Sequence, residues 1–288
     1  MIPASFDYYR PASVDEALGL LSEHAGAKLL AGGHSLLPMM KLRLAQPPAL
    51  IDVGRLADLK GIRRVRGSVH VGALTTHAEL ASSQELKAHC PLIPEAAAKI
   101  GDPAVRNRGT IGGNIAHADP ASDLPGVLVA AGATVVVGGR NGKERSVAAK
   151  DFFKGLLETD VRESEILLRV EIPEHADAGV AYLKVEHPAS GYAVCGAAAL
   201  VRKNPDGTCA DARLAFNGVT ATPYYNEALS KDLKGQPLDD AVIDQAVLDH
   251  VHIDDPLEDL HASGLYRMEL AKVYGRRALK AARDRARG

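Results

Sequence analysis

The pattern of apolar and polar positions predicts a chain that alternates helices and strands. Apolar residues recur at helical spacing over 14–21, and Ser13 followed by Glu16 has the form of a capping box at the start of this helix. Residues 28–31 are then predicted to form a short buried strand that runs directly into two glycines at 32–33. This order predicts a strand, a glycine turn and a helix.

The rest of the N-terminal half continues this alternation. We expect strands at 49–53, 61–65 and 68–73 to form one small mixed sheet, because they are short and separated by turn residues. A helical turn is predicted over 35–44, interrupted by Pro38, and a helix capped by Thr76 should have Leu80 and Leu86 facing inward. Further helices are predicted over 91–100, where Gly101-Asp102-Pro103 ends the helix, and over 124–131. Strands are predicted over 133–139 and 166–172.

The segment 173–179 is the expected boundary between two domains, since it gathers turn and polar residues between two strong strands. Beyond it, strands are predicted at 180–185, 193–202 and 213–219. A long amphipathic helix is predicted over 264–287, with basic residues in its last turns.

The length of 288 residues supports a division into compact units, because one simple core is rarely so large. We expect an α+β protein with one domain over 1–175. A smaller domain over 178–288 would consist of a three-stranded sheet and helices.

Composition and charge exclude several classes of protein. Hydrophobic residues at 46% and charged residues at 24% are ordinary for a packed globular chain, and the net charge of −2 gives no bulk attraction for nucleic acid. There is no secretion signal and no apolar run near the roughly 20 residues of a spanning helix, so a cytoplasmic protein is expected. Cys90, Cys195 and Cys209 are scattered, so no iron–sulfur cluster or other metal site is expected on this chain.

Two glycine-containing segments are the strongest candidates for chemistry. Ala31-Gly32-Gly33-His34-Ser35 follows a predicted strand, and glycine lets a chain turn tightly and bring several N–H groups close to a phosphate. Alone, such a motif is more often a plain turn, and Pro38 with the missing G-x-G-x-x-G pattern argues against a Rossmann fold. Thr110-Ile111-Gly112-Gly113-Asn114 repeats the combination of backbone donors and polar side chains. Two such segments suit a pyrophosphate.

Carboxylates follow the second segment. A carboxylate near a nucleotide site commonly accepts a ribose hydroxyl, which is one role for Asp119 or Asp123. The other role is to cap the helix that begins near Leu124, and we favour capping for Asp119.

Two segments, Ile100 to Asn114 and Ala31 to Pro38, carry a resemblance to a known family. The chain resembles the FAD-binding medium subunit of aerobic molybdenum hydroxylases (the xanthine dehydrogenase family), most of all the carbon monoxide dehydrogenase type. The likeness extends over nearly the whole chain. It implies a two-lobed FAD-binding domain of the vanillyl-alcohol-oxidase/para-cresol-methylhydroxylase type, followed by the family's small C-terminal domain.

The resemblance also implies which residues contact a non-covalent FAD. The segments 29–37 and 110–114 would wrap the pyrophosphate, Asp123 would contact the adenosine ribose, and Ile100 would pack against the flavin ring. The expected contacts are Leu29, Leu30, Ala31, Gly32, Gly33, His34, Ser35, Leu36, Leu37, Ile100, Thr110, Ile111, Gly112, Gly113, Asn114, Asp123, Leu167, Lys184 and Tyr192.

Three of these residues have particular expected roles. Tyr192 would lie over the flavin ring from the C-terminal domain, unless it is an ordinary core tyrosine. Lys184 near the ring would stabilise the negative charge of a reduced flavin. His34 would lie beside the pyrophosphate, with neither a metal nor a covalent flavin attached to it.

The activity implied by the resemblance is that of an oxidoreductase subunit in electron transfer. FAD would take electrons from a small iron–sulfur subunit and pass them to a quinone, a cytochrome, oxygen or NAD, and the substrate would be oxidised on a large molybdopterin subunit. A dimer of heterotrimers is expected, in the cytoplasm or at the inner face of the membrane through an acceptor. The substrate stays open among carbon monoxide, an aldehyde, a purine and another N-heterocycle.

Two alternatives remain. A free-standing FAD-dependent oxidase or dehydrogenase would act on an alcohol or a sugar, but the short C-terminal region is small for a domain that must enclose a substrate beside the flavin. A nucleotide-binding protein without enzymatic activity is the second.

Overall fold

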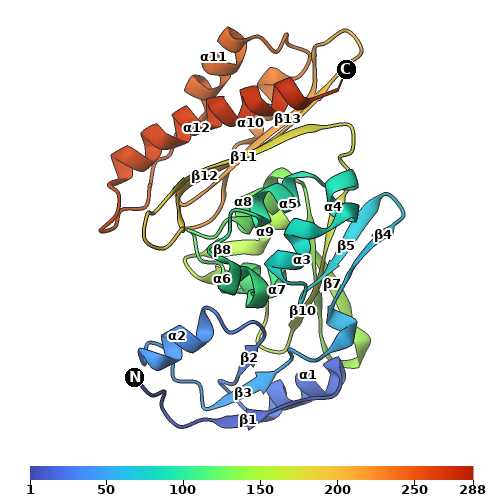
Figure 1. The fold of residues 1–288 in the computed structure, drawn as a ribbon, viewed down its shortest axis with the longest axis vertical. Coiled ribbons are helices and arrows are strands. Elements are labelled where there is room, and N and C mark those ends of the chain that lie inside the picture. The colour runs from blue at the N-terminus through green and yellow to red at the C-terminus, as the bar shows by residue number, and fades with distance from the viewer. Residues whose placement is uncertain (288) are drawn as a thin grey trace.

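The computed structural model describes residues 1–287 and shows three parts stacked along the long axis of the molecule (Figure 1). We call them the N-terminal lobe (1–59), the middle lobe (60–178) and the C-terminal domain (179–287). Each part contains both helices and strands, so the expected α+β class is confirmed.

The N-terminal lobe contains a small parallel sheet in the order β1-β3-β2. Its elements are β1 (Asp7–Tyr9), α1 (Val14–Glu23), β2 (Lys28–Leu30), α2 (Leu36–Lys41), β3 (Ala49–Asp52) and the 3-10 helix η1 (Ala57–Leu59). Ser13 caps α1 as predicted and accepts the N–H of Glu16 at 3.1 Å. Pro38 does not interrupt α2, because it lies in the first turn, where the helix needs no N–H donor. The strand predicted as buried is only half-buried, because β2 is an open edge of this sheet.

The middle lobe is built on an antiparallel sheet in the order β4-β5-β10-β6-β7. Its strands are β4 (Ile62–Val65), β5 (Ser68–Gly72), β6 (Thr134–Gly138), β7 (Glu144–Ala148) and β10 (Ile166–Pro173), with a separate hairpin of β8 (Phe153–Gly155) and β9 (Glu158–Thr159). The single mixed sheet expected from the sequence is therefore wrong. Ile51 of β3 packs in the small core with α1, whereas Val69 and Val71 of β5 pack in the large core of the middle lobe.

Short helices cover this sheet. They are α3 (His77–Ser82), α4 (Gln84–His89), α5 (Leu92–Ala97), α6 (Pro103–Arg108), α7 (Ile111–His117), α8 (Leu124–Ala130), α9 (Ala149–Phe152) and the 3-10 turn η2 (Arg140–Gly142). The helix predicted from Thr76 is two helices, because Ser83 ends α3 and caps α4. Asp102 caps α6, so Gly101-Asp102-Pro103 both follows one helix and begins the next.

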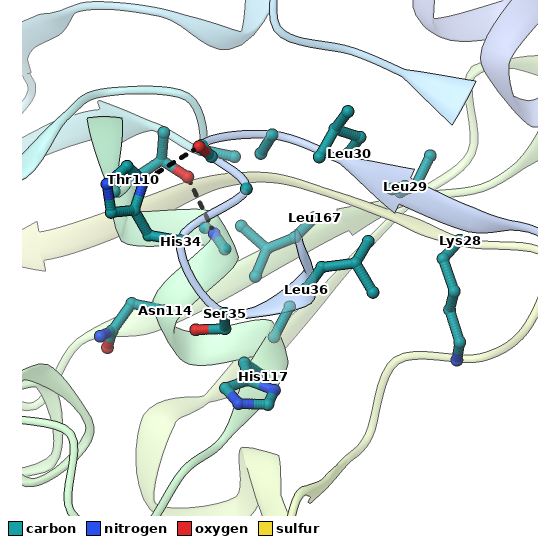
Figure 2. A pocket seen from close by; sticks show the side chains of 18 of the residues that line it. Lys28, Leu29, Leu30, His34, Ser35, Leu36, Thr110, Asn114, His117 and Leu167 are labelled. Atoms are coloured by element: carbon teal, nitrogen blue, oxygen red, sulfur yellow. Dashed lines mark hydrogen bonds between the residues drawn. The ribbon is translucent and has the colours of Figure 1, made fainter. Parts of the chain in front are cut away.

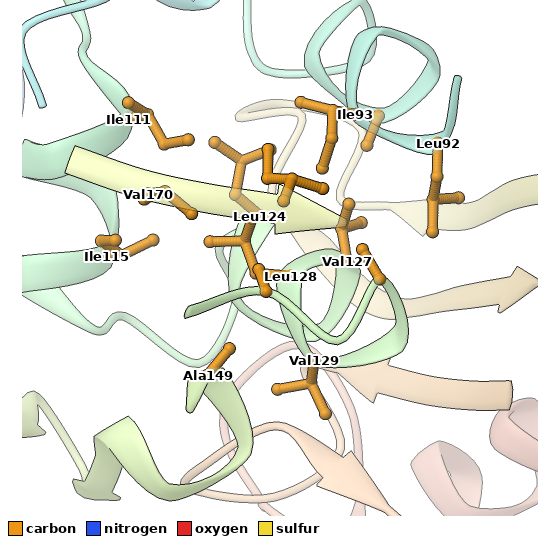
Figure 3. Packing of buried hydrophobic residues seen from close by; sticks show 14 of the residues in the cluster. Leu92, Ile93, Ile111, Ile115, Leu124, Val127, Leu128, Val129, Ala149 and Val170 are labelled. Carbon is orange, nitrogen blue, oxygen red and sulfur yellow. The ribbon is translucent and has the colours of Figure 1, made fainter. Parts of the chain in front are cut away.

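The large core lies between these helices and the sheet. Figure 3 shows Ile93 of α5, Ile111 of α7 and Leu124 of α8 gathered beside Val170 of β10. All four side chains are fully buried, and burial of one large aliphatic side chain stabilises a fold by about 2 kcal/mol. This packing fixes α7, which carries the second glycine motif.

The C-terminal domain contains an antiparallel sheet in the order β11-β12-β13-β14 with helices packed on it (Figure 1). Its elements are β11 (Gly179–Glu186), β12 (Ala193–Lys203), β13 (Cys209–Asn217), β14 (Tyr224–Tyr225), α10 (Glu227–Leu233), α11 (Asp240–His250) and α12 (Gly264–Arg285). The sheet has four strands rather than the expected three, because β14 is too short to show a period in the sequence. Over residues 1–287, no helix combines the length and the apolar character needed to cross a membrane.

Hydrogen bonds of His175 hold in place the segment 173–179, which was predicted as the domain boundary. His175 is 3% exposed, its Nε2 donates to the carbonyl of Ala131 at 2.7 Å, and Arg202 of β12 donates to its Nδ1 at 2.6 Å. An arginine can only donate and a carbonyl can only accept, so the ring is the neutral tautomer with its proton on Nε2. The division into 1–175 and 178–288 stays a prediction.

Stability should depend on pH through His175. Burial lowers the pKa of His175 from its ordinary value of 6.5, so its contribution to stability is complete above about pH 6.5 and is lost as the pH falls through the lower folded-state pKa. We expect His175→Gln, which does not titrate, to lose less thermal stability than the wild type between about pH 7.5 and about pH 5. Equal slopes of Tm against pH in the two proteins would contradict this.

Candidate functional site

A cavity of about 900 Å³ opens between the three parts of the molecule. The N-terminal lobe lines it with β2 and the loop that follows, the middle lobe with α7 and the start of β10, and the C-terminal domain with residues 190–192. Ligand pockets commonly measure roughly 300–1,000 Å³. This one is large enough for a dinucleotide.

The first glycine motif forms a tight loop from β2 into α2. Gly33 has φ = +78°, in the left-handed region that favours glycine. A Cβ on Gly32 would lie 2.1 Å from the carbonyl oxygen of Arg108, so only glycine fits between this loop and the end of α6. The loop is therefore held against the middle lobe.

The backbone N–H groups of residues 32–36 have no acceptor among residues 1–287. Ser35 does not cap α2 with its side chain, so it does not satisfy these donors either. Most backbone N–H groups that are shielded from water have partners, and successive free N–H groups form a concave site for an anion. These donors are available to an anion, and a phosphate at this loop stays a prediction.

The second glycine motif is the N-cap and first turn of α7 rather than a loop. Thr110 is the N-cap and accepts the N–H of Gly113 at 3.1 Å. The N–H groups of Ile111, Gly112 and Asn114 all donate to backbone carbonyls. The expectation of free backbone donors in this segment is wrong, because Thr110 and the carbonyls of Ala73 and Thr75, just after β5, accept them.

In place of backbone N–H groups, α7 presents polar side chains to the cavity. Figure 2 shows Asn114 and His117 on the side of the helix that faces Ser35 of the first motif. The amide of Asn114 donates to Ser122 at 3.3 Å, and its Oδ1 is buried with no partner. An orphaned polar atom at the cavity wall is consistent with a site that a polar ligand completes.

The two glycines of the second motif have different roles. A Cβ on Gly112 would lie 2.6 Å from the Cβ of Ala73, so Gly112 lets α7 pack against the segment that follows β5. A Cβ on Gly113 would lie 3.0 Å from Oγ1 of Thr110 and 3.9 Å from Ala31. Gly113 is exposed toward the cavity and lets a ligand approach the helix.

Three histidines at the cavity wall, His24, His77 and His117, were not among the expected contacts. His77 is 3% exposed, its Nδ1 has no partner, and burial lowers its pKa to about 4. His117 lies three residues after Asn114, and helical spacing from the glycine motif could have identified it. No local pattern marks His77, whose ring lies against Gly109 at the end of α6.

A buried ion pair lies at the end of the cavity nearest the C-terminal domain. Asp123 is 4% exposed, Nζ of Lys184 lies 2.9 Å from its Oδ1, and the hydroxyl of Tyr182 donates to it at 2.6 Å. Lys184 also donates to the carbonyl of Lys99 at 2.8 Å. Because Tyr182 and Lys184 belong to β11, this network joins the C-terminal sheet to the cavity wall.

The charge of this network is balanced. Burial raises the pKa of Asp123, while Lys184 and the hydrogen bond from Tyr182 act in the opposite direction and favour the carboxylate. Removing one partner of a buried pair leaves an uncompensated charge, which is strongly unfavourable.

Ile100, Asp123 and Tyr192 line the same end of the cavity. An ideal Cβ on Gly191, next to Tyr192, would lie 3.7 Å from Cα of Gly101. Asp123 was expected at the adenosine ribose and Lys184 at the flavin ring, but the two side chains touch. Which end of a bound FAD each of them would contact stays a prediction.

Most of the expected contact residues line the cavity. Tyr192 is 47% exposed and is therefore not a core tyrosine. Leu37, Ile111 and Lys184 do not line it: Ile111 is in the core and Lys184 is turned to Asp123. Those that do are Leu29, Leu30, Ala31, Gly32, Gly33, His34, Ser35, Leu36, Ile100, Thr110, Gly112, Gly113, Asn114, Asp123, Leu167 and Tyr192.

Asp119 does not cap α8, although capping was the favoured prediction. Its Oδ1 accepts the N–H of Ala121 at 2.9 Å, and α8 has no side-chain cap. Nδ1 of His34 lies 3.3 Å from the carbonyl of Gly32. In the described part of the chain, no three His, Cys, Asp or Glu side chains are placed to hold a metal ion.

Comparisons with known proteins agree with this geometry. Residues 4–175 match the family model of the FAD binding domain in molybdopterin dehydrogenase, and residues 180–282 match the CO dehydrogenase flavoprotein C-terminal domain. The chain is 42% identical to the carbon monoxide dehydrogenase medium chain of Hydrogenophaga pseudoflava, over 98% of each chain. It is 37% identical to the glyceraldehyde dehydrogenase medium chain of Sulfolobus acidocaldarius, over 97% of this chain and 99% of the relative.

A solved structure shows the same fold. The carbon monoxide dehydrogenase from Hydrogenophaga pseudoflava that lacks the Mo-pyranopterin moiety of its cofactor matches with a TM-score of 0.96 and 42% identity, over all of both chains. Two family models together cover nearly the whole sequence, and the relatives match from end to end. This chain belongs to the family of FAD-binding flavoprotein subunits of molybdopterin dehydrogenases.

Proposed function

We propose that this chain is the FAD-binding electron-transfer subunit of a molybdenum hydroxylase complex. One observation carries the proposal: residues 32–36, whose five successive N–H groups have no acceptor within residues 1–287, line a dinucleotide-sized cavity in a member of an FAD-binding family. When bound, FAD supplies the chemistry, since a flavin exchanges electrons both singly and in pairs.

The residues of this chain bind and orient the cofactor. The N–H groups of 32–36 would hold the pyrophosphate, with Asn114 and His117 facing it from α7 (Figure 2). Ile100 and Tyr192 would cover the flavin ring, and Asp123 would lie beside it with Lys184 behind. This assignment places Asp123 at the ring rather than at the ribose.

The partners are part of the proposal. The relatives are named medium chains, so we propose a small iron–sulfur subunit as electron donor and a large molybdopterin subunit as the place of substrate oxidation, in a dimer of heterotrimers. A quinone, a cytochrome, oxygen or NAD would accept the electrons. A cytoplasmic location, at the inner face of the membrane through that acceptor, stays a prediction.

The substrate belongs to the large subunit in this proposal. The two named relatives carry the names of carbon monoxide and glyceraldehyde dehydrogenases, yet both align with this chain from end to end. The FAD site is therefore shared among complexes with different substrates. Carbon monoxide is the first candidate, from the higher identity.

A free-standing FAD oxidase is the rival function. Such an enzyme needs a substrate pocket beside the flavin, and here the C-terminal domain contributes only Ser190, Gly191 and Tyr192 to the cavity wall. This small contribution favours an electron-transfer subunit over a free-standing oxidase.

Purification of the native assembly tests this function. We expect one small and one large chain to co-purify with this one, carrying iron–sulfur clusters and molybdenum, and we expect the substrate to reduce the flavin only in the assembly. Absorption spectra and metal analysis provide the measurement. Turnover of simple alcohols or sugars by the isolated, FAD-loaded chain would refute the relay.

Gly113→Val should remove FAD without unfolding the chain. The valine side chain would fill the space in which the cofactor approaches α7, and we expect FAD affinity to fall by more than about tenfold. Gly19→Val in α1 is the matched control, since nothing lies within 4 Å of a Cβ there. FAD binding is measured by flavin fluorescence, with circular dichroism to show that both variants fold. Normal FAD binding by Gly113→Val would place the cofactor elsewhere.

The two charges beside the flavin should shift its potential in opposite directions. Lys184→Met removes a positive charge and should lower the midpoint potential, because reduction adds negative charge to the ring. Asp123→Asn leaves Lys184 uncompensated and should raise it. We expect shifts of roughly 30 mV, about 1.4 kcal/mol for a two-electron couple, by spectroelectrochemical titration.

The double variant Asp123→Asn/Lys184→Met is the control for these shifts. It removes both charges, so its potential should return close to that of the wild type. Shifts of the same sign in both single variants would mean that the pair acts only through folding.

A further inference from the structure

The loop between β11 and β12 carries Tyr192 to the rim of the cavity. We call residues 187–192 the Tyr192 loop, and its last three residues line the cavity. The loop closes on itself, because the N–H of His187 donates to the carbonyl of Tyr192 and the N–H of Gly191 donates to the carbonyl of His187, both at 2.8 Å. Gly191 has φ = +69°, a conformation that favours glycine in such a tight turn.

The ring of His187 lies against a second histidine. His261, from the segment between α11 and α12, has its ring centroid 4.2 Å from that of His187, with an angle of 55° between the ring planes. Nδ1 of His187 lies 3.1 Å from Oγ of Ser190, and this oxygen accepts the N–H of Tyr192 at 3.3 Å. The contact between the two rings is therefore linked to the backbone of Tyr192.

A buried arginine holds the segment that carries His261. Arg267 of α12 is 3% exposed, and its Nη2 lies 2.6 Å from Oδ2 of Asp259. The other oxygen of Asp259 accepts the N–H of His261 at 2.8 Å. Arg267 also donates to the carbonyl of Val194, near the start of β12, at 2.7 Å. One guanidinium thus fixes both the turn at His261 and the strand that follows the Tyr192 loop.

Neither ring of the pair has a carboxylate at ion-pair distance. Within residues 1–287, the histidines that lie in ion pairs are His70, His89 and His250. A proton on both His187 and His261 would place two positive charges in contact, and like charges at this distance repel each other. His187 is half-buried and His261 is exposed, so water screens part of this repulsion.

The charged groups around the pair have other partners or form no ion pair with it. Asp259 is paired with Arg267, and Asp123 is paired with Lys184. The charged residues on the surrounding elements are Lys184, Glu186, Glu258, Asp259 and Arg267 of the C-terminal domain and Arg106, Asp119 and Asp123 of the middle lobe.

We propose that the contact between His187 and His261 holds the Tyr192 loop at the rim of the cavity and releases it when both rings are protonated. With at most one proton on the pair, the rings pack as they do in this structure. In acid, the second proton separates them and loosens the loop. This inference rests on the FAD function proposed above, in which Tyr192 covers the flavin, so that His261 is a positioning residue that acts through His187.

Hydrogen exchange tests the contact in the full chain freed of flavin. Opening of the loop exposes the N–H of His187, of Gly191 and of Ala193, which donates to the carbonyl of Ala121 in the middle lobe at 3.1 Å. After correction for the intrinsic effect of pH, these amides should exchange about fivefold faster at about pH 5 than at about pH 7.5, the range in which histidine titrates. Amides in the centre of β13 give the reference for global unfolding.

Variants of His261 separate charge from packing. His261→Phe keeps an aromatic ring against His187 but takes no proton, so its loop should exchange equally at the two pH values. His261→Ala removes the contact, and its loop should exchange rapidly at both. His252→Phe, at an exposed histidine of the same domain, is the matched control and should behave as the wild type. Melting temperatures show that the variants fold.

The flavin reports on the same loop when FAD is bound. Access to the ring follows the population of the open loop, so iodide should quench flavin fluorescence about fivefold more strongly at about pH 5 than at about pH 7.5 in the wild type. In His261→Phe, quenching should be equal at the two pH values.

The outcomes separate this inference from the proposed function. Loop exchange that does not change with pH in the wild type, or that changes equally in His261→Phe, would overturn the role of the histidine pair. If the amides respond as expected but iodide quenches equally at both pH values, the pair holds the loop and the position of the flavin under Tyr192 is wrong. If the chain binds no FAD, the FAD function is wrong, and hydrogen exchange still decides the role of the pair.

Discussion

The contact between Gly32 and the end of α6 is the constraint on which the cofactor site depends. The carbonyl of Arg108 occupies the place where any other residue at position 32 would carry its Cβ. The two lobes therefore approach to backbone contact, and the chain turns so tightly at Gly33 that the N–H groups of 32–36 find no carbonyl of their own. The same feature that joins the lobes leaves the donors that an anion can use.

A second interaction ties the C-terminal domain to the other end of the cavity. Asp123 lies at the N-terminus of α8, Lys184 and Tyr182 lie on β11, and all three side chains are buried. A buried ion pair is weak evidence for stability, since its desolvation offsets much of its attraction. In the proposed assignment it keeps a fixed charge beside the flavin ring, where the low local dielectric would make its field effective.

The contact at Gly32 and the Asp123–Lys184 pair lie at different parts of the cavity, and we assign these parts different roles. The N-terminal and middle lobes form most of the cavity wall, including the proposed phosphate site, and the C-terminal domain adds only residues 190–192 within its described part. A relay needs a bound cofactor at a defined potential and does not need a substrate pocket. The near end-to-end likeness to medium chains named for two different dehydrogenases fits the proposed division of roles.

Local patterns in the chain were enough to predict the α+β class, the cap at Ser13 and the glycine turn after β2, because φ/ψ preferences and side-chain periods act over a few residues. They also marked both glycine motifs. They could not show that Thr110 begins a helix whose N–H groups already have acceptors. Two of these acceptors are the carbonyls of Ala73 and Thr75, just after β5 and far away in the sequence. The pairing of Asp123 with Lys184 and the separation of β3 from β4 and β5 likewise depend on which surfaces bury one another, and that is a property of the packed molecule.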